Sequence, residues 1–162
     1  MFRYCEFIRS ALDYCIDCSK DYNEHDEVIA CLKTYDNMIH SKFRYSIAKD
    51  IARFLYSNYH AQIKSLRLYG STMEYTAGKF SDIDIIIRVE FSSENLCKSL
   101  KDLDKQLCKD YYRLLSEEIS EYSYFIDPHI INDDPANKAL SSMAYLEYIV
   151  NNDSVELLPT PA

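Results

Sequence analysis

Two aspartates separated by a single residue, Asp82 and Asp84, stand at the head of an apolar run at residues 85–87. If this segment is a strand, its side chains alternate between two faces. The two carboxylates then share one face, with their Cα atoms roughly 7 Å apart. Carboxylates at that spacing repel each other unless a divalent cation lies between them, and oxygen ligands of this kind suit Mg²⁺. The pair therefore predicts a magnesium site.

A second group of polar residues precedes the aspartates, where a short apolar strand containing Leu66 and Leu68 ends at Gly70. Gly70 leaves out a side chain where a backbone must come close to a ligand. Ser71 and Thr72 offer hydroxyl and N–H groups at an expected helix start, which is a natural cradle for phosphate. This loop therefore predicts phosphate binding next to the metal site.

These two features together resemble the nucleotidyltransferase superfamily with the DNA polymerase β-like fold. Its signature is an apolar strand, Gly-Ser, about ten residues, and Asp-x-Asp in a second apolar strand. Gly70-Ser71 and Asp82-Ile83-Asp84 match that signature, and residues 72–81 separate them. The resemblance is closest to the minimal and the antibiotic nucleotidyltransferases of bacteria.

The resemblance implies that a hydroxyl attacks the α-phosphate of a nucleoside triphosphate and that pyrophosphate leaves. Two metal ions about 3.5–4 Å apart stabilise the charge on the attacking and leaving oxygens in such sites. Asp82 and Asp84 would hold both Mg²⁺ ions, and Ser71 with its N–H would hold the β- and γ-phosphates. Gly70 and Thr72 complete the candidate nucleotide-binding loop.

Lys79, in the connection between the two strands, is a further candidate for a contact with phosphate or the leaving group. Its simpler interpretation is a loop lysine in water, which we favour. Arg67 and Arg88 could also reach phosphate, and we assign them no role.

The family usually places a third carboxylate on a later strand, facing the Asp-x-Asp pair. Asp127 matches by position, and would bind the catalytic metal and accept the proton of the attacking hydroxyl. Asp133 and Asp134 follow in the next turn and are the alternatives. Asp134 precedes a proline, which is more typical of a turn than of a metal ligand.

The strand that carries Asp127 is expected at residues 122–131. Pro128 lacks a backbone donor and predicts an edge strand or a bulge, which makes the direction of the Asp127 side chain an open question. His129 alternates onto the same face as Asp127. We interpret it as a packed or surface histidine rather than as a base.

Helices are predicted on both sides of the motif from apolar residues at three- and four-residue spacing. Two are expected in residues 1–40, the second reaching Ile39. A third is expected to start at Ser41 and to lead into the Gly-Ser strand. A fourth starts at Ser93 or the residue before it, and a last helix covers about residues 135–151.

Composition narrows the class of protein. A formal net charge of −8 over 162 residues argues against an extended nucleic-acid-binding face, which needs clustered Lys and Arg. No apolar run reaches the length of a membrane span, about 18 residues. Because no signal peptide is recognisable, the six cysteines are expected to be reduced thiols in a cytoplasmic protein. Cys15 and Cys18 form a lone CxxC, which we expect on one apolar helix face rather than at a metal.

We therefore expect a single α+β nucleotidyltransferase domain over residues 1–162, with a small mixed sheet. Residues 1–40 form a helical extension, and residues 41–158 form the catalytic core. The resemblance implies transfer of AMP from ATP to a hydroxyl acceptor on a protein or small molecule. A small helical protein is the expected protein partner. The alternative is a non-catalytic, antitoxin-like module that keeps the fold and neutralises a partner protein by contact.

Overall fold

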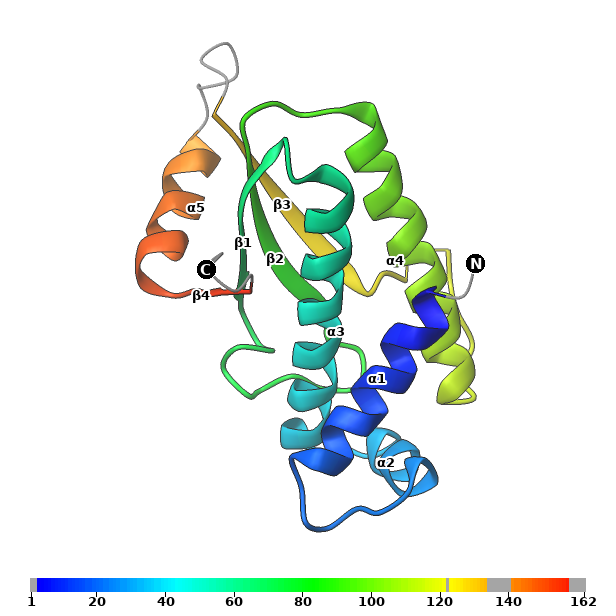
Figure 1. Cartoon of the computed structure of the whole chain (residues 1–162). Helices are drawn as coiled ribbons and strands as arrows, with labels where there is room; N and C mark the ends of the chain where they lie inside the picture. The colour runs from blue at the N-terminus through cyan, green and yellow to red at the C-terminus, as the bar shows by residue number, and fades with distance from the viewer. Residues whose placement is uncertain (1–2, 122, 134–140, 158–162) are drawn as a thin grey trace.

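The structure is a computed structural model, and it describes residues 3–121, 123–133 and 141–157. A four-stranded sheet lies at its centre, with the strand order β3-β2-β1-β4. β1 (Ile63–Tyr69) runs antiparallel to β2 (Ile83–Val89) and to the short β4 (Val155–Glu156), whereas β3 (Ile126–Asn132) runs parallel to β2 (Figure 1). The predicted α+β fold with a small mixed sheet is confirmed.

The central strand β2 is apolar on both faces because both faces of the sheet are covered. Ile85 belongs to the main core, which also contains Leu66 of β1. Ile86 points to the other face and packs with Ile131 of β3 and Ile149 of α5. The apolar run after the aspartates therefore anchors the strand in two separate clusters.

Helices α3 (Asn37–Tyr59) and α4 (Glu94–Leu114) lie on the main-core face of the sheet, and α5 (Ser141–Asn152) lies on the opposite face (Figure 1). α4 is the crossover that two parallel strands require. Ser93 caps α4 as predicted, because its hydroxyl accepts a hydrogen bond from the Leu96 N–H at 3.2 Å.

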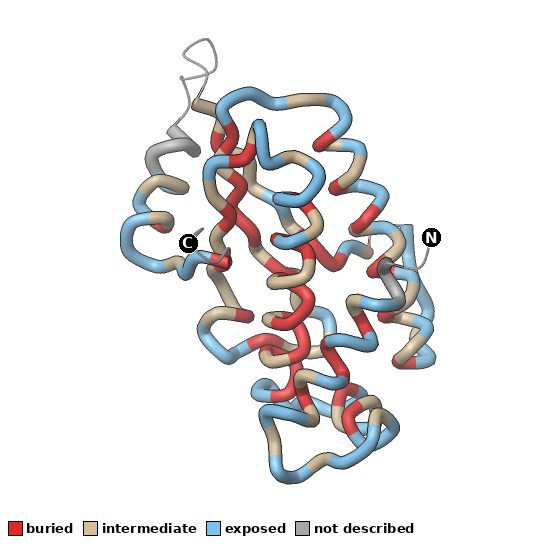
Figure 2. Tube along the Cα trace, in the orientation of Figure 1, coloured by how far each residue is buried: buried red, intermediate tan, exposed pale blue. Residues whose placement is uncertain are grey.

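The N-terminal helices α1 (Arg3–Asp17) and α2 (His25–Leu32) share the main core rather than forming a separate unit. Leu12 and Leu32 are buried in the same cluster as Phe43 of α3. Figure 2 shows buried positions running along α3 and the parts of α1 and α2 that face it.

The boundary between the second and third helices differs from the prediction. α2 ends at Leu32, and Tyr35 is 92% exposed. α3 begins at Asn37 instead of Ser41, because the Asp36 carboxylate accepts hydrogen bonds from the N–H groups of Met38 and Ile39. An aspartate at this position satisfies donors that the first helical turn leaves unpaired.

The two CxxC cysteines do not share a helix face, contrary to the prediction. Cys15 is buried in α1, and burial raises the pKa of its thiol to about 12. Cys18 lies beyond the end of α1 and is exposed. Because the helix ends between them, their three-residue spacing does not place the two side chains on one helix face.

At the C-terminal end, α5 matches the predicted last helix from residue 141 onward, and positions 135–140 lie outside the described residues. The short strand β4 was not predicted. It pairs with β1 through Glu156 opposite Arg67 and Val155 opposite Leu68. None of the helices in the described part of the chain combines the length and apolar character needed to cross a bilayer.

Candidate active site

The site lies where β2 and β3 begin. The parallel register places Asp84 opposite Asp127 and Ile86 opposite His129. His129 Nε2 is 3.1 Å from Asp127 Oδ2 and 3.8 Å from Asp84 Oδ1. One ligand atom from each of these three residues lies within 4.8 Å of the other two, a group that could hold a metal ion.

Pro128 does not divert Asp127 from this face. β3 is an edge strand, so the missing N–H of Pro128 leaves no gap between two strands. Its register with β2 runs without a shift from Ile126 to Asn132. Pro128 lines a shallow apolar cavity with Leu100 of α4, so it faces away from the carboxylates. The edge-strand alternative is therefore correct, and the described strand contains no bulge.

Asp82 stands just before β2 and adds its charge to the group. Burial raises the pKa of the Asp82 carboxyl, and the charges of Asp84 and Asp127 raise it further. The Tyr124 hydroxyl hydrogen-bonds the Asp82 carboxylate. The group of ligand atoms within 4.8 Å of one another joins Asp84 to Asp127 and His129 on the neighbouring strand, whereas the sequence pattern pairs Asp84 with Asp82.

The Gly-Ser loop lies at the other side of Asp84. Gly70 has a φ of +77°, and a Cβ added there would lie 2.4 Å from Asp84 Oδ2. No helix follows Ser71, contrary to the prediction. Instead the Glu74 N–H donates to the Gly70 carbonyl at 3.0 Å, and the Thr76 N–H donates to the Ser71 carbonyl at 2.9 Å. The segment after Ser71 is therefore a hydrogen-bonded turn rather than the start of a helix.

Of the two other predicted phosphate contacts, Thr72 is buried and Lys79 is paired with an acidic residue. Thr72 is 2% exposed, and its hydroxyl is without a hydrogen-bond partner among the described residues. Thr72 lines a cavity of about 230 Å³ together with Tyr14 of α1 and Tyr45 of α3. Lys79 forms an ion pair with Glu117, which also raises the pKa of the lysine. It is therefore neither a fully solvated lysine nor a free phosphate ligand.

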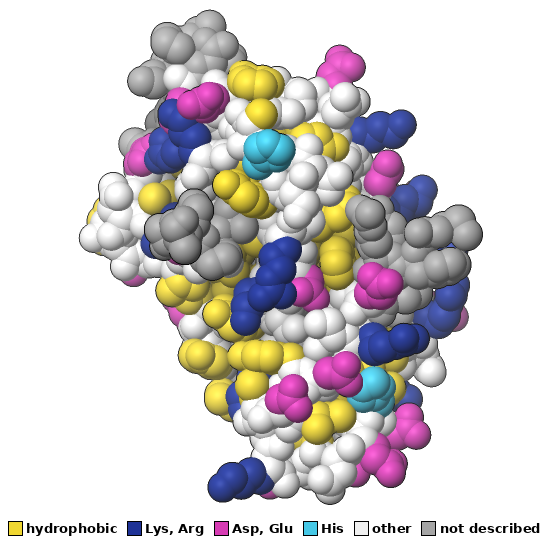
Figure 3. All heavy atoms as spheres, in the orientation of Figure 1, with side chains coloured by type: hydrophobic (Ala, Val, Ile, Leu, Met, Phe, Trp, Pro, Cys, Tyr) yellow, Lys and Arg dark blue, Asp and Glu magenta, His cyan; other side chains and the backbone are white. Residues whose placement is uncertain are grey.

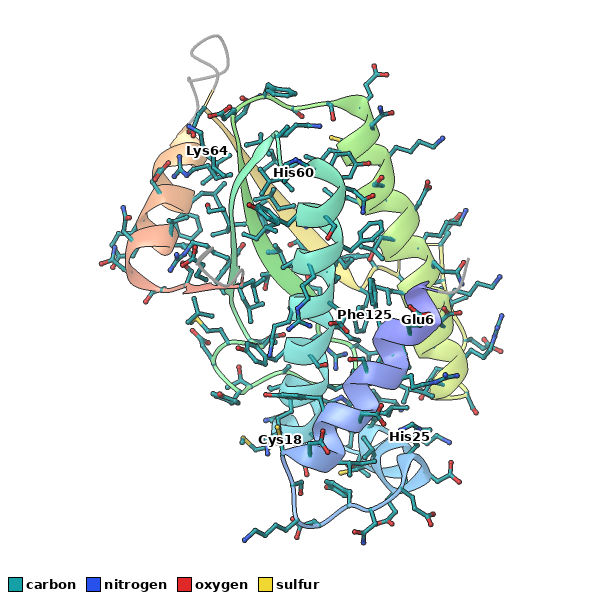
Figure 4. The ribbon with its side chains drawn as sticks, viewed as in Figure 1. Glu6, Cys18, His25, His60, Lys64 and Phe125 are labelled. Atoms are coloured by element: carbon teal, nitrogen blue, oxygen red, sulfur yellow. The ribbon has the colours of Figure 1, made fainter. Side chains whose placement is uncertain are left out.

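Arg44 of α3 holds the segment that leads into Asp82. Its side chain is fully buried, and it donates from Nε to the Ser81 carbonyl at 2.8 Å and from Nη2 to the Lys79 carbonyl at 3.0 Å. The Tyr111 hydroxyl donates to the same Lys79 carbonyl at 2.7 Å. The guanidinium also lies 5.2 Å from the ring centre of Phe125, which Figure 4 labels between α3 and α4.

Asp104 of α4 holds the start of the strand that carries Asp127. Its Oδ1 accepts hydrogen bonds from the N–H groups of Phe125 and Ile126, each at 2.7 Å. Burial raises the pKa of Asp104, and the two backbone donors oppose that rise. Two side chains from the helical layer, the buried Arg44 and the half-buried Asp104, thus fix the starts of both strands. Sequence patterning missed both, because their partners are backbone atoms distant in sequence.

An aromatic cavity of about 280 Å³ adjoins Asp82. Its walls include Phe80 and Tyr112, whose rings stack with centres 6.0 Å apart, and the exposed Tyr124. Planar rings bind well against such walls. The cavity is therefore a candidate for the ring of a substrate beside the carboxylates.

Of the two alternatives for the third carboxylate, only Asp133 lies in the described part of the chain, and it is paired away from the site. Asp133 accepts from Arg88 at 2.8 Å and pairs with Lys64 at 3.2 Å, so its charge is already compensated. Asp134 lies outside the described residues. Arg67 donates to Ser154, next to β4. These contacts hold the sheet edges and α5 together and do not extend to the carboxylate group.

Comparison with known families agrees with this geometry. The family model described as a nucleotidyltransferase domain matches residues 46–144, which is more than half of the chain. The matched span contains the Gly-Ser loop and all three aspartates, and it leaves out α1 and α2. The comparison with curated proteins finds no match.

Proposed function

Because the chain belongs to the nucleotidyltransferase domain family, we propose that it transfers AMP from ATP to a hydroxyl acceptor on a protein or small molecule. One observation carries this proposal. The parallel register sets Asp127 directly opposite Asp84, so a third carboxylate lies beside the Asp-x-Asp pair. A contact-only module has no need for three acidic groups on one face, where they repel each other. The choice of AMP comes from the family resemblance.

The residues of the site fit divalent metal ions. The clustered oxygens of Asp84 and Asp127 are hard ligands, and Asp82 adds a third carboxylate next to them. The close approach of Gly70 leaves no room for a side chain against Asp84. Two bound Mg²⁺ ions would supply the positive charge that stabilises the transferring phosphoryl group and the leaving pyrophosphate.

The protein's own groups then have distinct tasks. Ser71, at the turn next to Asp84, binds the β- and γ-phosphates through its hydroxyl and N–H. Asp127 is 39% exposed and accepts the proton of the attacking hydroxyl. Lys79 contacts phosphate only after it exchanges its bond to Glu117, so its role is secondary.

The acceptor enters, in this proposal, from the side of β2 opposite the Gly-Ser loop. The cavity formed by Phe80, Tyr112 and Tyr124 adjoins Asp82 there and is large enough for one ring. A polymeric nucleic acid is not the expected acceptor. On the face that Figure 3 shows, Lys and Arg are separated by acidic and apolar side chains, and the net charge is −8. A cytoplasmic location is part of the proposal, since the described cysteines are free thiols.

Calorimetry of ATP binding tests the first half of the proposal. ATP is expected to bind in the presence of Mg²⁺ and much more weakly in EDTA, and Asp84→Asn is expected to abolish the difference. ATP labelled at the α-phosphate then tests transfer to a purified candidate, such as a helical protein encoded next to this chain. Binding that ignores the metal contradicts the site. Metal-dependent binding without transfer to any acceptor favours the antitoxin-like module.

A further inference from the structure

Asp84, Asp127 and His129 form the group of potential metal ligands described above. Of these three residues, only His129 was not assigned to the site from the sequence. We propose that His129 is a metal ligand and that Asp84, Asp127 and His129 form a site for a divalent first-row transition metal, with Mn²⁺ as its probe. The inference rests on metal binding in the proposed function, and it does not depend on nucleotide transfer.

The distances suit ligands of one ion. Two adjacent ligands of a small octahedral ion are about 3 Å apart, since each lies about 2.1 Å from the metal. His129 Nε2 and Asp127 Oδ2 are 3.1 Å apart, and His129 Nε2 and Asp84 Oδ1 are 3.8 Å apart. A small side-chain movement brings all three atoms to one centre, because they already lie within 4.8 Å of one another.

The three ligands are held by elements that do not move independently. Asp84 lies on β2, and Asp127 and His129 lie on β3, which pairs with β2 without a register shift. The Tyr69 ring lies 5.6 Å from the His129 ring, centre to centre, and restricts its rotation. The His129 side chain is 30% exposed, so an ion can reach it from solvent. Sites on paired strands hold their ligands more precisely than sites on loops.

The imidazole nitrogen changes which ion the site prefers. Mg²⁺ takes oxygen ligands in nearly ideal octahedral geometry and gives up its waters reluctantly. Imidazole favours transition metals, whose affinity for nitrogen ligands rises along the first row. A site of two carboxylates and one imidazole therefore binds Mn²⁺ more tightly than Mg²⁺.

A different role for His129 predicts the opposite behaviour. A protonated imidazole would act as the positive partner of both carboxylates and would compete with a metal ion. Removing it would then leave the affinity for metal unchanged or increase it. The two roles are therefore separated by the sign of one measured change.

The experiment titrates the full chain, stripped of metal, with Mn²⁺ alone and follows binding by electron paramagnetic resonance. Pulsed measurements on the wild-type complex are expected to show the coupling of a nitrogen nucleus to the bound Mn²⁺. His129→Ala and His129→Gln are expected to remove that coupling and to weaken Mn²⁺ binding by about tenfold or more. Mg²⁺ binding is expected to change less, because Mg²⁺ depends on the carboxylates.

His25→Ala is the matched control. His25 Nε2 lies 2.6 Å from Asp13 Oδ1, so it is also a histidine in contact with an aspartate, but it lies at α2, well away from the sheet (Figure 4). It is expected to leave Mn²⁺ binding and the nitrogen coupling as in the wild type. Melting curves by circular dichroism confirm that all variants are folded.

Bound Mn²⁺ without nitrogen coupling, or unchanged affinity in both His129 variants, overturns the inference. The proposed function can fail separately. If Mn²⁺ binds with nitrogen coupling but ATP does not bind, the metal site stands and the nucleotide assignment is wrong. If ATP binds with Mg²⁺ but nitrogen coupling is absent, the nucleotide assignment stands and His129 is not a ligand.

Discussion

Gly70 and Asp84 approach so closely that a single added carbon would collide with the carboxylate. A Cβ at Gly70 would lie 2.4 Å from Asp84 Oδ2, and the φ of Gly70 is +77°. The antiparallel pairing of Tyr69 with Asp84 produces this approach, since Gly70 directly follows Tyr69. The loop proposed to bind phosphate and the carboxylate proposed to bind metal therefore meet at one position that only glycine can occupy without strain.

Gly70→Ala is expected to lower the free energy of unfolding by about 1–2 kcal/mol from backbone strain alone. It is also expected to displace the Asp84 carboxylate and to weaken Mg²⁺-dependent ATP binding. Denaturant unfolding and calorimetry measure the two effects. Gly78→Ala is the control, because the nearest atom to a Cβ there is Ser81 Oγ at 3.9 Å. Equal effects of the two substitutions would count against this role of Gly70.

Asp127→Ala is expected to reduce turnover by about 10²–10⁴-fold, because it removes the group proposed to accept the proton. Mg²⁺-ATP is expected to bind still, since Asp82 and Asp84 remain. Transfer of labelled AMP and calorimetry check the two statements. Asp133→Ala is the control, because Asp133 pairs with Arg88 and Lys64 away from the site. Transfer that survives Asp127→Ala unchanged would show that another group is the third acid.

Arg44→Met is expected to destabilise the protein and to loosen the segment before Asp82. The Ser81 carbonyl loses its 2.8 Å partner, and an unsatisfied buried acceptor costs about 1–3 kcal/mol. Arg53→Met on the same helix removes an exposed pair with Asp50 and is expected to cost no more than about 0.5 kcal/mol. Chemical denaturation gives both values. A similar cost for the two variants would show that Arg44 does not hold this segment.

The stability of the fold is expected to fall as the pH drops below the ordinary histidine pKa of about 6.5. Burial lowers the pKa of His40, and its ring contacts the Thr34 carbonyl and Arg44 Nη1. Between the folded and unfolded pKa values of His40 the unfolded chain binds more protons, so the contribution of His40 to stability rises with pH there and is constant above about 6.5. His40→Gln is expected to flatten this dependence in urea unfolding.

The control for the pH experiment is His60→Gln, at the exposed end of the same helix (Figure 4). It is expected to leave the wild-type dependence on pH intact. If His40→Gln keeps the full loss of stability on acidification, a different group is responsible for it.

Removal of residues 1–35 is expected to cause aggregation or dimerisation, because α1 and α2 cover part of the main core. Leu12 and Leu32 are buried there against α3. The truncated chain keeps α3 together with its capping residue Asp36, so the helix itself is not disturbed. Light scattering after size-exclusion chromatography measures the outcome. A soluble, folded monomer would show that the N-terminal helices are dispensable for the core.

Much of the fold follows from local patterns. The apolar run at residues 85–87 identifies the strand that carries Asp84, and the alternation of side chains along a strand places Asp127 and His129 on one face of the next. The apolar stripe of α4 and its cap at Ser93 are also local signals. These features are readable because each depends on residues within a few positions of one another. The start of α3 was missed because a cap at Asp36 outweighed the apolar repeat that runs through Ile39.

The sequence by itself determined that carboxylates, a glycine-serine loop and a buried strand occur together, and this was enough to indicate the family. Only the tertiary structure decided that His129 joins Asp84, that Gly70 touches that carboxylate, and that Arg44 and Asp104 hold the starts of the two strands. Strand register and buried side-chain to backbone contacts connect positions far apart in the chain. The periodicity of apolar residues indicates only on which face of a strand or helix a side chain lies. It does not indicate which residues of a neighbouring element that side chain contacts.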